Sequence, residues 1–249
     1  MNTKTLFLAW QDKARTRQWF PVGRLDVQQP QSNYRFAYLR GAERARREGG
    51  FEPLVDFPDL QRHYEASDLF PLFQNRVLTP GRLDFPEYLR HLDLPEKADP
   101  IEILSVDGGY RATDFFEVFP KIERREDGSF RCRFFLHGWR HVSPAGQARL
   151  GQLQPGDKLV AAIEVNSPAT YLAVQVQTAD YHMIGWTPRY LVGDLINAIA
   201  RSATKLEAEV VRMNPAPAPS KQRVLIEFRG RWPAEYEPMS GDDFQFLTA

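Results

Sequence analysis

The chain has 249 residues, with 32 basic and 32 acidic side chains, so its formal net charge is zero. This length suits one large domain or two ordinary ones, and a hydrophobic content of 43% is typical of a globular protein. The zero net charge argues against a protein that coats DNA through charge alone. A single cysteine, Cys132, excludes an internal disulfide and fits a reducing compartment.

The N-terminal stretch MNTKTLFLAWQDK has too short an apolar run for a signal peptide or a membrane span. We therefore expect a cytoplasmic protein with no membrane partner. Charge is also distributed unevenly. Residues 1–125 hold 19 basic and 19 acidic side chains, residues 128–233 hold 13 and 7, and residues 234–249 hold four acidic side chains and no basic one. A basic second half is the minimum for holding phosphates, although an excess of this size is also ordinary surface variation.

Apolar periodicity and turn residues predict the elements of the first half. Three strands are expected first, at Thr5–Trp10, Trp19–Leu25 and Tyr34–Leu39. Helices are expected at Gly41–Glu48, Gln61–Arg76 and Pro86–Leu92. Ile101–Val106 and Phe115–Phe119 flank an Asp-Gly-Gly turn that is typical of a hairpin, although the first run equally suits a helix end.

The motifs of this half are VGRL at 22–25, YRFAY at 34–38, LFPLFQNRVL at 69–78, and the run from Ile103 through Gly108-Gly109 to FFEV at 115–118. In this order they resemble the N-terminal subdomain of HipA-type kinases. The resemblance implies an α+β domain at 1–122, a mixture of sheet and helices. No kinase core follows, because the sequence lacks a Gly-rich phosphate loop with a lysine and the catalytic and metal-binding acids.

The second half begins after a charged, turn-rich linker at 123–129. Six strands are expected, at Arg131–His137, Leu159–Glu164, Tyr171–Gln177, Tyr181–Trp186, Leu206–Met213 and Arg223–Arg229. A short helix is expected after Ser143 and an amphipathic one at Leu191–Ala200. Six short strands with one or two helices suit an OB-like barrel. Residues 233–249 are expected to form an acidic C-terminal tail.

Three motifs occur in order in this half: FFLHGWRH at 134–141, Asn166-Ser167-Pro168 between two apolar strands, and Ile184-Gly185-Trp186 ahead of a helix that starts near Pro188-Arg189. They resemble a HIRAN domain, an OB-like β-barrel module that holds single-stranded DNA, especially 3′ ends. The resemblance places this barrel at 130–232. The fold class expected for the whole chain is therefore α+β, a HipA-N-like domain followed by a HIRAN-type barrel with short helices.

The resemblance also assigns roles to residues. Arg140 would contact phosphate and His141 would stack on a base. Asn166 and Pro168 match the family's Asn-Pro-Tyr-Asp segment, which here includes Ser167, but Ala169 and Thr170 stand where the family has Tyr and Asp. The Tyr stacks on the terminal base, a contact of ~1–3 kcal/mol, and the Asp reads the 3′-hydroxyl. Recognition of a 3′ end is therefore left open.

The same resemblance makes Trp186 a substitute stacking platform, and Arg189 with the helix N–H groups would bind a phosphate. Tyr171 comes one residue late and is expected on the opposite face of its strand. Each assignment has a structural alternative. Trp139 and Trp186 also suit core aromatics, Arg140 and Arg189 suit surface ion pairs, and residues 166–168 suit a simple turn.

The sequence contains no convincing set of residues for an enzymatic site. His137 and His141 lack a third ligand at metal-binding spacing, Cys132 suits a half-buried core thiol, and no G-x-S-x-G motif occurs. We therefore predict a non-catalytic protein without cofactor or metal, which binds single-stranded DNA or DNA ends and serves a helicase or nuclease effector. The alternative is a regulatory, antitoxin-like subunit of a HipA-like kinase, whose barrel no longer binds DNA.

Overall fold

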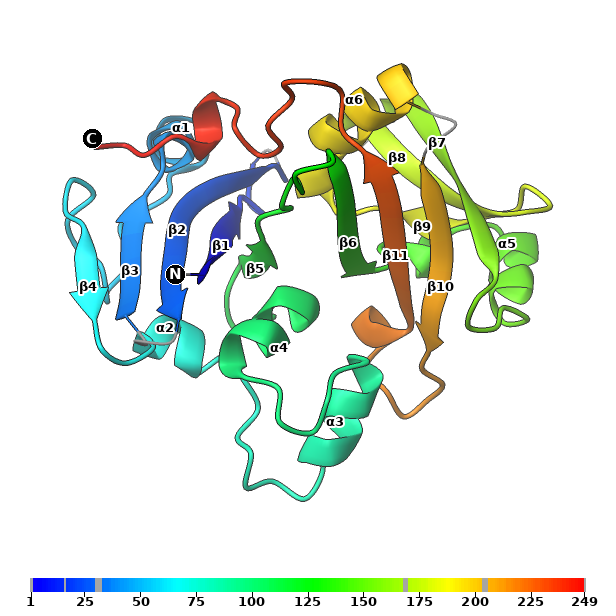
Figure 1. Ribbon diagram of the computed structural model, residues 1–249, viewed down its shortest axis with the longest axis horizontal. Coiled ribbons are helices and arrows are strands. Elements are labelled where there is room, and N and C mark those ends of the chain that lie inside the picture. The colour runs from blue at the N-terminus through cyan, green and yellow to red at the C-terminus, as the bar shows by residue number, and fades with distance from the viewer. Residues whose placement is uncertain (1, 16, 30–32, 168–169, 203–205, 249) are drawn as a thin grey trace. The chain divides into compact units, whose positions relative to one another are not determined.

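The computed structural model describes residues 2–15, 17–29, 33–167, 170–202 and 206–248, without the side chains of residues 2, 29 and 202. The chain forms two compact units. Unit 1 comprises Met1–Leu89, Leu94–Lys121 and Met239–Ala249, and unit 2 comprises Arg90–Asp93 and Ile122–Pro238. Each unit contains one antiparallel sheet, which confirms the mixed α+β class (Figure 1). None of the helices described is long and apolar enough to cross a membrane.

The sheet of unit 1 has the strand order β4-β3-β2-β1-β5. Its long central strands arise from alternating apolar residues, and the β1–β2 register places Leu6 opposite Leu25. In chain order the elements as far as residue 120 are β1 (Asn2–Gln11), β2 (Trp19–Gln29), β3 (Asn33–Tyr38), α1 (Arg40–Gly49), β4 (Tyr64–Ala66), α2 (Pro71–Gln74), α3 (Phe85–His91), α4 (Pro100–Asp107) and β5 (Phe116–Pro120).

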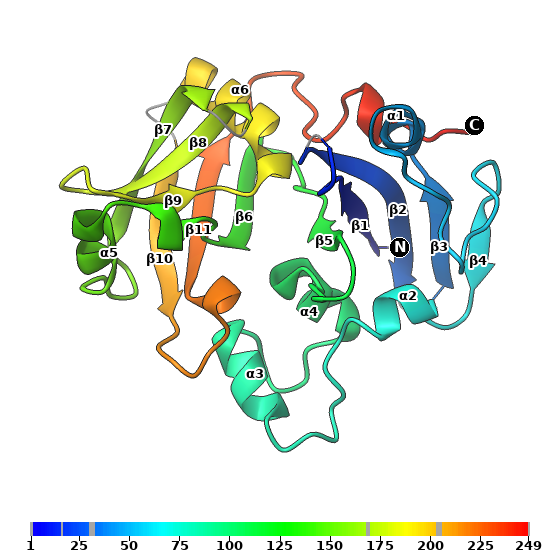
Figure 2. The same cartoon turned by 180° about the vertical axis from the view of Figure 1, so that it is seen from behind.

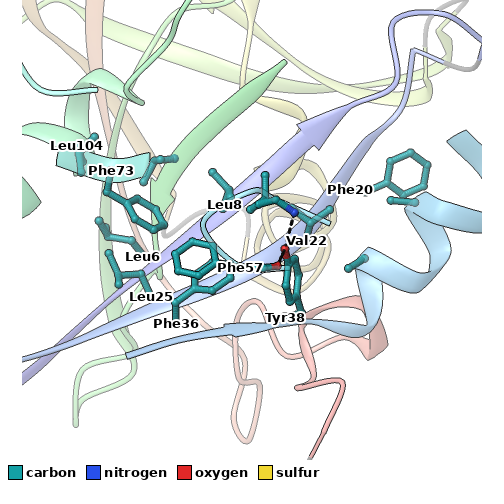
Figure 3. Close-up of a cluster of buried hydrophobic side chains, with 14 of the residues drawn as sticks. Leu6, Leu8, Phe20, Val22, Leu25, Phe36, Tyr38, Phe57, Phe73 and Leu104 are labelled. Atoms are coloured by element: carbon teal, nitrogen blue, oxygen red, sulfur yellow. Dashed lines mark hydrogen bonds between the residues drawn. The ribbon is translucent and has the colours of Figure 1, made fainter. Parts of the chain in front are cut away.

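The core of unit 1 is rich in aromatic side chains. Phe36 and Phe57 are stacked with ring centroids 3.9 Å apart, and both are fully buried. Tyr38 is buried beside them, where its hydroxyl donates to the carbonyl of Phe57 at 2.7 Å and accepts from the N–H of Leu54 at 2.8 Å (Figure 3). Burial raises the pKa of Tyr38 to about 12. These contacts therefore fix the segment 51–57 against the sheet.

One sequence prediction for unit 1 is wrong, and a second, which left two alternatives open, is decided by the structure. The helix predicted at Gln61–Arg76 is absent as such, because Tyr64–Ala66 pairs with β3 and a new helix starts at Pro71, whose ring cannot continue a preceding helix. Ile101–Val106, which suited a hairpin strand and a helix end equally, lies in the helix α4. This helix starts with a capping box between Asp99 and Glu102.

The acidic tail expected at 233–249 is divided between the units, since residues from Met239 onward belong to unit 1. There, a 3₁₀ helix at Asp242–Phe244 is followed by an isolated bridge between Phe246 and Leu39. The chain thus returns to its first sheet after completing the second unit.

The six strands predicted for the second half are all present, in the order β6-β11-β10-β7-β8-β9 (Figure 2). The predicted helices are confirmed as well. The strands and α-helices of unit 2 are β6 (Ser129–Phe135), α5 (Pro144–Leu150), β7 (Lys158–Ser167), β8 (Tyr171–Thr178), β9 (Met183–Trp186), α6 (Val192–Ser202), β10 (Glu207–Met213) and β11 (Val224–Arg231). Short 3₁₀ helices lie at Trp139–His141, Arg189–Leu191 and Ser220–Gln222.

One face of the β6–β11 ladder holds a buried carboxylate. Glu227 on β11 is 0% exposed and pairs with the guanidinium groups of Arg131, Arg133 at 2.6 Å and Arg229 at 2.5 Å. Burial alone would raise the pKa of Glu227, but the hydrogen bonds from these arginines outweigh it and lower the pKa. Cys132 is also buried, and burial raises the pKa of its thiol to about 12, as befits a core residue.

Candidate nucleic-acid interface

The glycine motifs at 138 and 185 pair with each other. His137, just past the end of β6, exchanges two backbone hydrogen bonds with Trp186 of β9, at 3.0 and 2.9 Å. A Cβ on Gly138 would lie 2.5 Å from the indole ring of Trp186, and one on Gly185 would lie 2.5 Å from the carbonyl oxygen of His137. Both glycines also have positive φ, 67° and 155°. Only glycine therefore allows the two segments to approach so closely.

Arg140 and His141 lie in the 3₁₀ helix that follows Gly138, and both are exposed. Within the described part of the chain, neither side chain has a hydrogen bond or ion pair. The surface ion pair that was the alternative for Arg140 is therefore absent there. The guanidinium of Arg140 keeps all its N–H donors for an external acceptor.

The two tryptophans of these motifs are half-buried and neither belongs to the hydrophobic core. The indole N–H of Trp139 donates to the carbonyl of Ser220 at 2.8 Å, and Arg223 lies over its ring, 5.5 Å from the centroid. The indole N–H of Trp186 donates to the carboxylate of Glu164 at 2.6 Å. Both rings are thus held in fixed orientations, which a stacking platform requires.

Positive charge gathers around His137. Burial, and after it the nearby cations Lys221 and Arg189, lower the pKa of this imidazole to about 4. His137 is therefore neutral at physiological pH, and Arg189 and Lys221 lie close enough to it to act on its charge. Arg189 belongs to the 3₁₀ helix that leads into α6, which starts at Val192. We call Arg140, His141, Trp186, Arg189 and Lys221 the Trp186 surface.

Asn166 and Ser167 lie at the far end of the β7–β8 hairpin. Asn166 is exposed, with φ of 60°, at an irregularity in the register, and Ser167 is buried opposite Tyr171. Pro168 and Ala169, which carried part of the family comparison, lie outside the described residues. Glu164, two residues before Asn166 on β7, accepts from Trp186, so it links this hairpin to the Trp186 surface.

The end of this hairpin exposes apolar side chains, a feature that sequence reasoning missed. Val165 is 66% exposed and Tyr171 is 84% exposed, with φ of 62°. Leu172 and Ile163 are also exposed, whereas Val174, which pairs with Ile163 and continues the same face, is fully buried. The apolar face of the hairpin therefore extends beyond the core into solvent. Single exposed apolar residues are common, but a group of this kind indicates a contact surface.

Sequence reasoning also missed Lys221 and Glu164. Lys221 lies in the connector between β10 and β11, where nothing in the local pattern distinguishes it from a solvated lysine. Glu164 alternates with apolar residues along β7, as a surface residue does. Among the described residues, no group of three His, Cys, Asp or Glu side chains could hold a metal ion.

No protein-family model and no curated protein matches this sequence. Among solved structures, the crystal structure of a Lactobacillus plantarum protein, a Northeast Structural Genomics Consortium target, is similar to part of the chain. The two share 18% sequence identity with a TM-score of 0.30, and the match covers 42% of this chain and 100% of that one. A likeness this weak establishes neither a shared fold nor a shared function.

Proposed function

We propose that unit 2 is a nucleic-acid-binding module that holds single-stranded DNA or a frayed DNA end, and that the protein is a non-catalytic accessory to a helicase or nuclease. The observation that carries this proposal is the Trp186 surface: Arg189 and Lys221 act on the charge of His137, whose backbone pairs with the half-buried Trp186, and the exposed Arg140 follows in the next turn. Cations beside an oriented aromatic ring are what proteins use to bind a single strand, since the cations pair with phosphates and the ring stacks on bases.

The electrostatics of the site favour an anion. Arg140 has an exposed guanidinium that no described residue engages. The carboxylate of Glu164 already accepts from the indole of Trp186, which fixes it at the edge of the ring. A phosphate bound by Arg140 would gain charge-assisted hydrogen bonds.

The geometry of the sheet supports a HIRAN-type, OB-like barrel for this unit. β6 and β9 are the two edge strands in the sheet order, and the hydrogen bonds between His137 and Trp186 join the chain just beyond β6 to β9. A sheet whose edges meet in this way approaches a closed barrel. In the proposed barrel the HGWRH and IGW motifs meet at the closure, which explains why each needs its glycine.

Recognition of a 3′-hydroxyl is not part of the proposal. Thr170 stands where the family has its acidic residue, and it supplies a hydroxyl rather than a carboxylate. Tyr171 is available for stacking but lies at the hairpin end, beyond the predicted position of the family's Tyr. We therefore expect similar affinity for strands ending in a hydroxyl and in a phosphate.

Fluorescence anisotropy with a short labelled single strand tests the proposal. Wild type, Arg140→Ala and the control Arg111→Ala, an exposed arginine of unit 1, are compared at two salt concentrations. We expect salt-dependent binding, which Arg140→Ala weakens several-fold while the slope of log affinity against log salt falls by about 1. The control should bind as wild type does. Absence of binding at micromolar protein, to single strands and to a blunt duplex alike, would refute the proposal.

A further inference from the structure

The C-terminal segment, Gly241–Thr248, lies on unit 1 as an extended peptide lies on a receptor. The N–H of Leu247 donates to the carbonyl of Tyr38 at 3.0 Å, and the N–H of Arg40 donates to the carbonyl of Gln245 at 2.9 Å. Between these bonds, Phe246 forms a bridge with Leu39. Backbone pairing of this kind is how β-augmentation sites hold short peptides.

The charges of the two partners are complementary. Asp242 pairs with the Nη1 of Arg40 at 2.6 Å, and Asp243 pairs with the Nη2 of Arg44 at 2.7 Å. Both arginines belong to α1, which starts directly after the paired backbone of β3. The acidic pair of the segment therefore lies against the arginines of α1. The extended residues that follow this pair form hydrogen bonds with the backbone at the end of β3.

The side chains of the segment interlock with those of the sheet. The ring of Phe244 lies edge-on to Phe7, with centroids 4.9 Å apart, and Phe246 lies under the guanidinium of Arg24 at 4.9 Å. The hydroxyl of Thr248 is 3.0 Å from the Nε2 of His63. Alternate residues of the segment thus make the specific contacts, as in a bound strand.

Gly41, in the first turn of α1, allows the backbone of the segment to lie close to this helix. A Cβ on Gly41 would lie 3.1 Å from the carbonyl oxygen of Asp243, closer than most Cβ contacts. The same Cβ would clash with the carbonyl of Pro21 at 2.1 Å, so Gly41 serves both the sheet and the segment. The backbone of the segment consequently passes close to the first turn of α1.

The receptor is buried whereas the segment is peripheral. Phe7, Tyr38 and Leu39 are each at most 1% exposed. From Gly241 to Thr248 no side chain is buried, and the ion pair of Asp242 is exposed on both sides. The segment is therefore less buried than the residues it lies on, and Leu247 is its contact with the hydrophobic core.

We propose that this face of unit 1 is a peptide-docking site for an extended segment of a partner protein, with two acidic residues followed by an aromatic, a variable and a second aromatic residue, and that the C-terminal segment is its resident intramolecular ligand. A tethered ligand acts at an effective concentration in the millimolar range, so a partner peptide binds only when it displaces the segment. Release of the segment makes the site available.

The test uses a fluorescein-labelled synthetic peptide with the sequence of residues 240–249, SGDDFQFLTA. Its affinity is measured by anisotropy for the full wild-type chain and for the full chain with Asp242→Lys and Asp243→Lys, in which the tethered segment is repelled by Arg40 and Arg44. We expect the reversed chain to bind the peptide at least tenfold more tightly than wild type, and a scrambled peptide of the same composition not to bind.

A charge exchange gives the matched control. A chain with Arg40→Glu and Arg44→Glu should bind a peptide in which both aspartates are lysines, and should reject SGDDFQFLTA. Circular dichroism establishes that each variant is folded; where the reversed chain is not, Phe246→Ser, which removes the contact with Arg24, takes its place. Equal and weak binding of the peptide to wild type and to a folded variant would overturn the proposal.

Discussion

Each unit buries a charged side chain that ion pairs hold in place, but these two side chains have opposite sign. In unit 1 the side chain is a cation. The side chain of Arg76 is 2% exposed, donates to both carboxylate oxygens of Asp114 and also donates to the carbonyl of Gly109 at 2.9 Å. In unit 2 the buried group is Glu227, which three arginines cover. Unit 1 therefore neutralises its buried charge with a single partner, whereas unit 2 surrounds its buried charge with an excess of cations.

The same pairing leaves cations at the surface of unit 2. The carboxylate of Glu227 is withdrawn from solvent, while the side chains of Arg131 and Arg229 remain 43% and 49% exposed. Further acids of this face, Glu209 and Asp93, are each shared by two cations. These three acids of unit 2 are thus held in ion pairs, and exposed cations such as Arg140 contribute to its external potential.

Removing the buried anion should have the largest effect. Glu227→Gln leaves three arginine side chains without their common carboxylate, and loss of one member of a buried charged group costs about 3–5 kcal/mol. We expect urea unfolding to show this loss, with hydrogen exchange increased in unit 2 and not in unit 1. Glu207→Gln, on the exposed neighbouring strand opposite Arg229, is the control and should change stability little.

The pH dependence of the same variant sharpens the test. Because the pKa of Glu227 is lower in the folded state than its ordinary value of 4.5, its contribution is fully present above pH 4.5 and is lost as the pH falls through the folded pKa. Wild-type unit 2 should therefore lose stability in acid below pH 4.5 more steeply than Glu227→Gln does. Parallel acid profiles for the two chains would contradict this account.

Removing the buried cation of unit 1 should cost less. Arg76→Met deletes the ion pair with Asp114 and the hydrogen bond to Gly109, but Asp114 is one-quarter exposed and can regain water. We expect a loss of about 2–3 kcal/mol, the scale of hydrogen bonds to charged groups, confined to unit 1 by hydrogen exchange. A loss as large as that of Glu227→Gln would show that the two buried charges contribute equally to stability, and would contradict the difference proposed between the units.

Local sequence signals predicted the elements of unit 2 better than those of unit 1. Its strands alternate and its helix at Pro144 has a Ser143 cap, so each element can be found without its partners. In unit 1, the region 61–76 depends on pairing with β3, and pairing between distant strands leaves no local signal. The capping box at Asp99 and Glu102 was readable and could have decided between the strand and the helix at Ile101–Val106.

The same limit applies to the functional sites: their local motifs could be found in the sequence, but the tertiary contacts between them could not. The motifs at Gly138 and Gly185 were found in the sequence, but not that they pair with each other. The run VLIEF, with one acid among apolar residues, could have indicated a buried carboxylate at Glu227. The approach of Lys221 to His137, and the return of the C-terminal segment to unit 1, are tertiary contacts that composition and periodicity do not encode.

A substitution at the closure of the unit 2 sheet should have an intermediate effect. In Gly138→Ala the new methyl group would lie 2.5 Å from the ring of Trp186, at a φ of 67° that alanine disfavours. We expect a loss of about 1–3 kcal/mol and a shift in tryptophan emission as the indole leaves Glu164. Gly193→Ala, where nothing lies within 4 Å of the added Cβ, is the control and should be neutral or slightly stabilising in its helix.

The smallest effect on stability should come from two exposed tyrosines, Tyr171 at the start of β8 and Tyr181 in the turn that follows β8, which form a matched pair. Tyr171 and Tyr181 are 84% and 75% exposed, and both have positive φ. Replacing either with serine should change unfolding free energy by less than about 0.5 kcal/mol. Their effects on DNA should differ, because only Tyr171 lies at the hairpin end beside Asn166 and Val165. Tyr171→Ser should weaken binding to a single strand by about 1–3 kcal/mol, the value of one stacked base, while Tyr181→Ser should leave it unchanged. If both variants bind as wild type does, the hairpin end is not part of the interface, and the strand is held by the Trp186 surface alone.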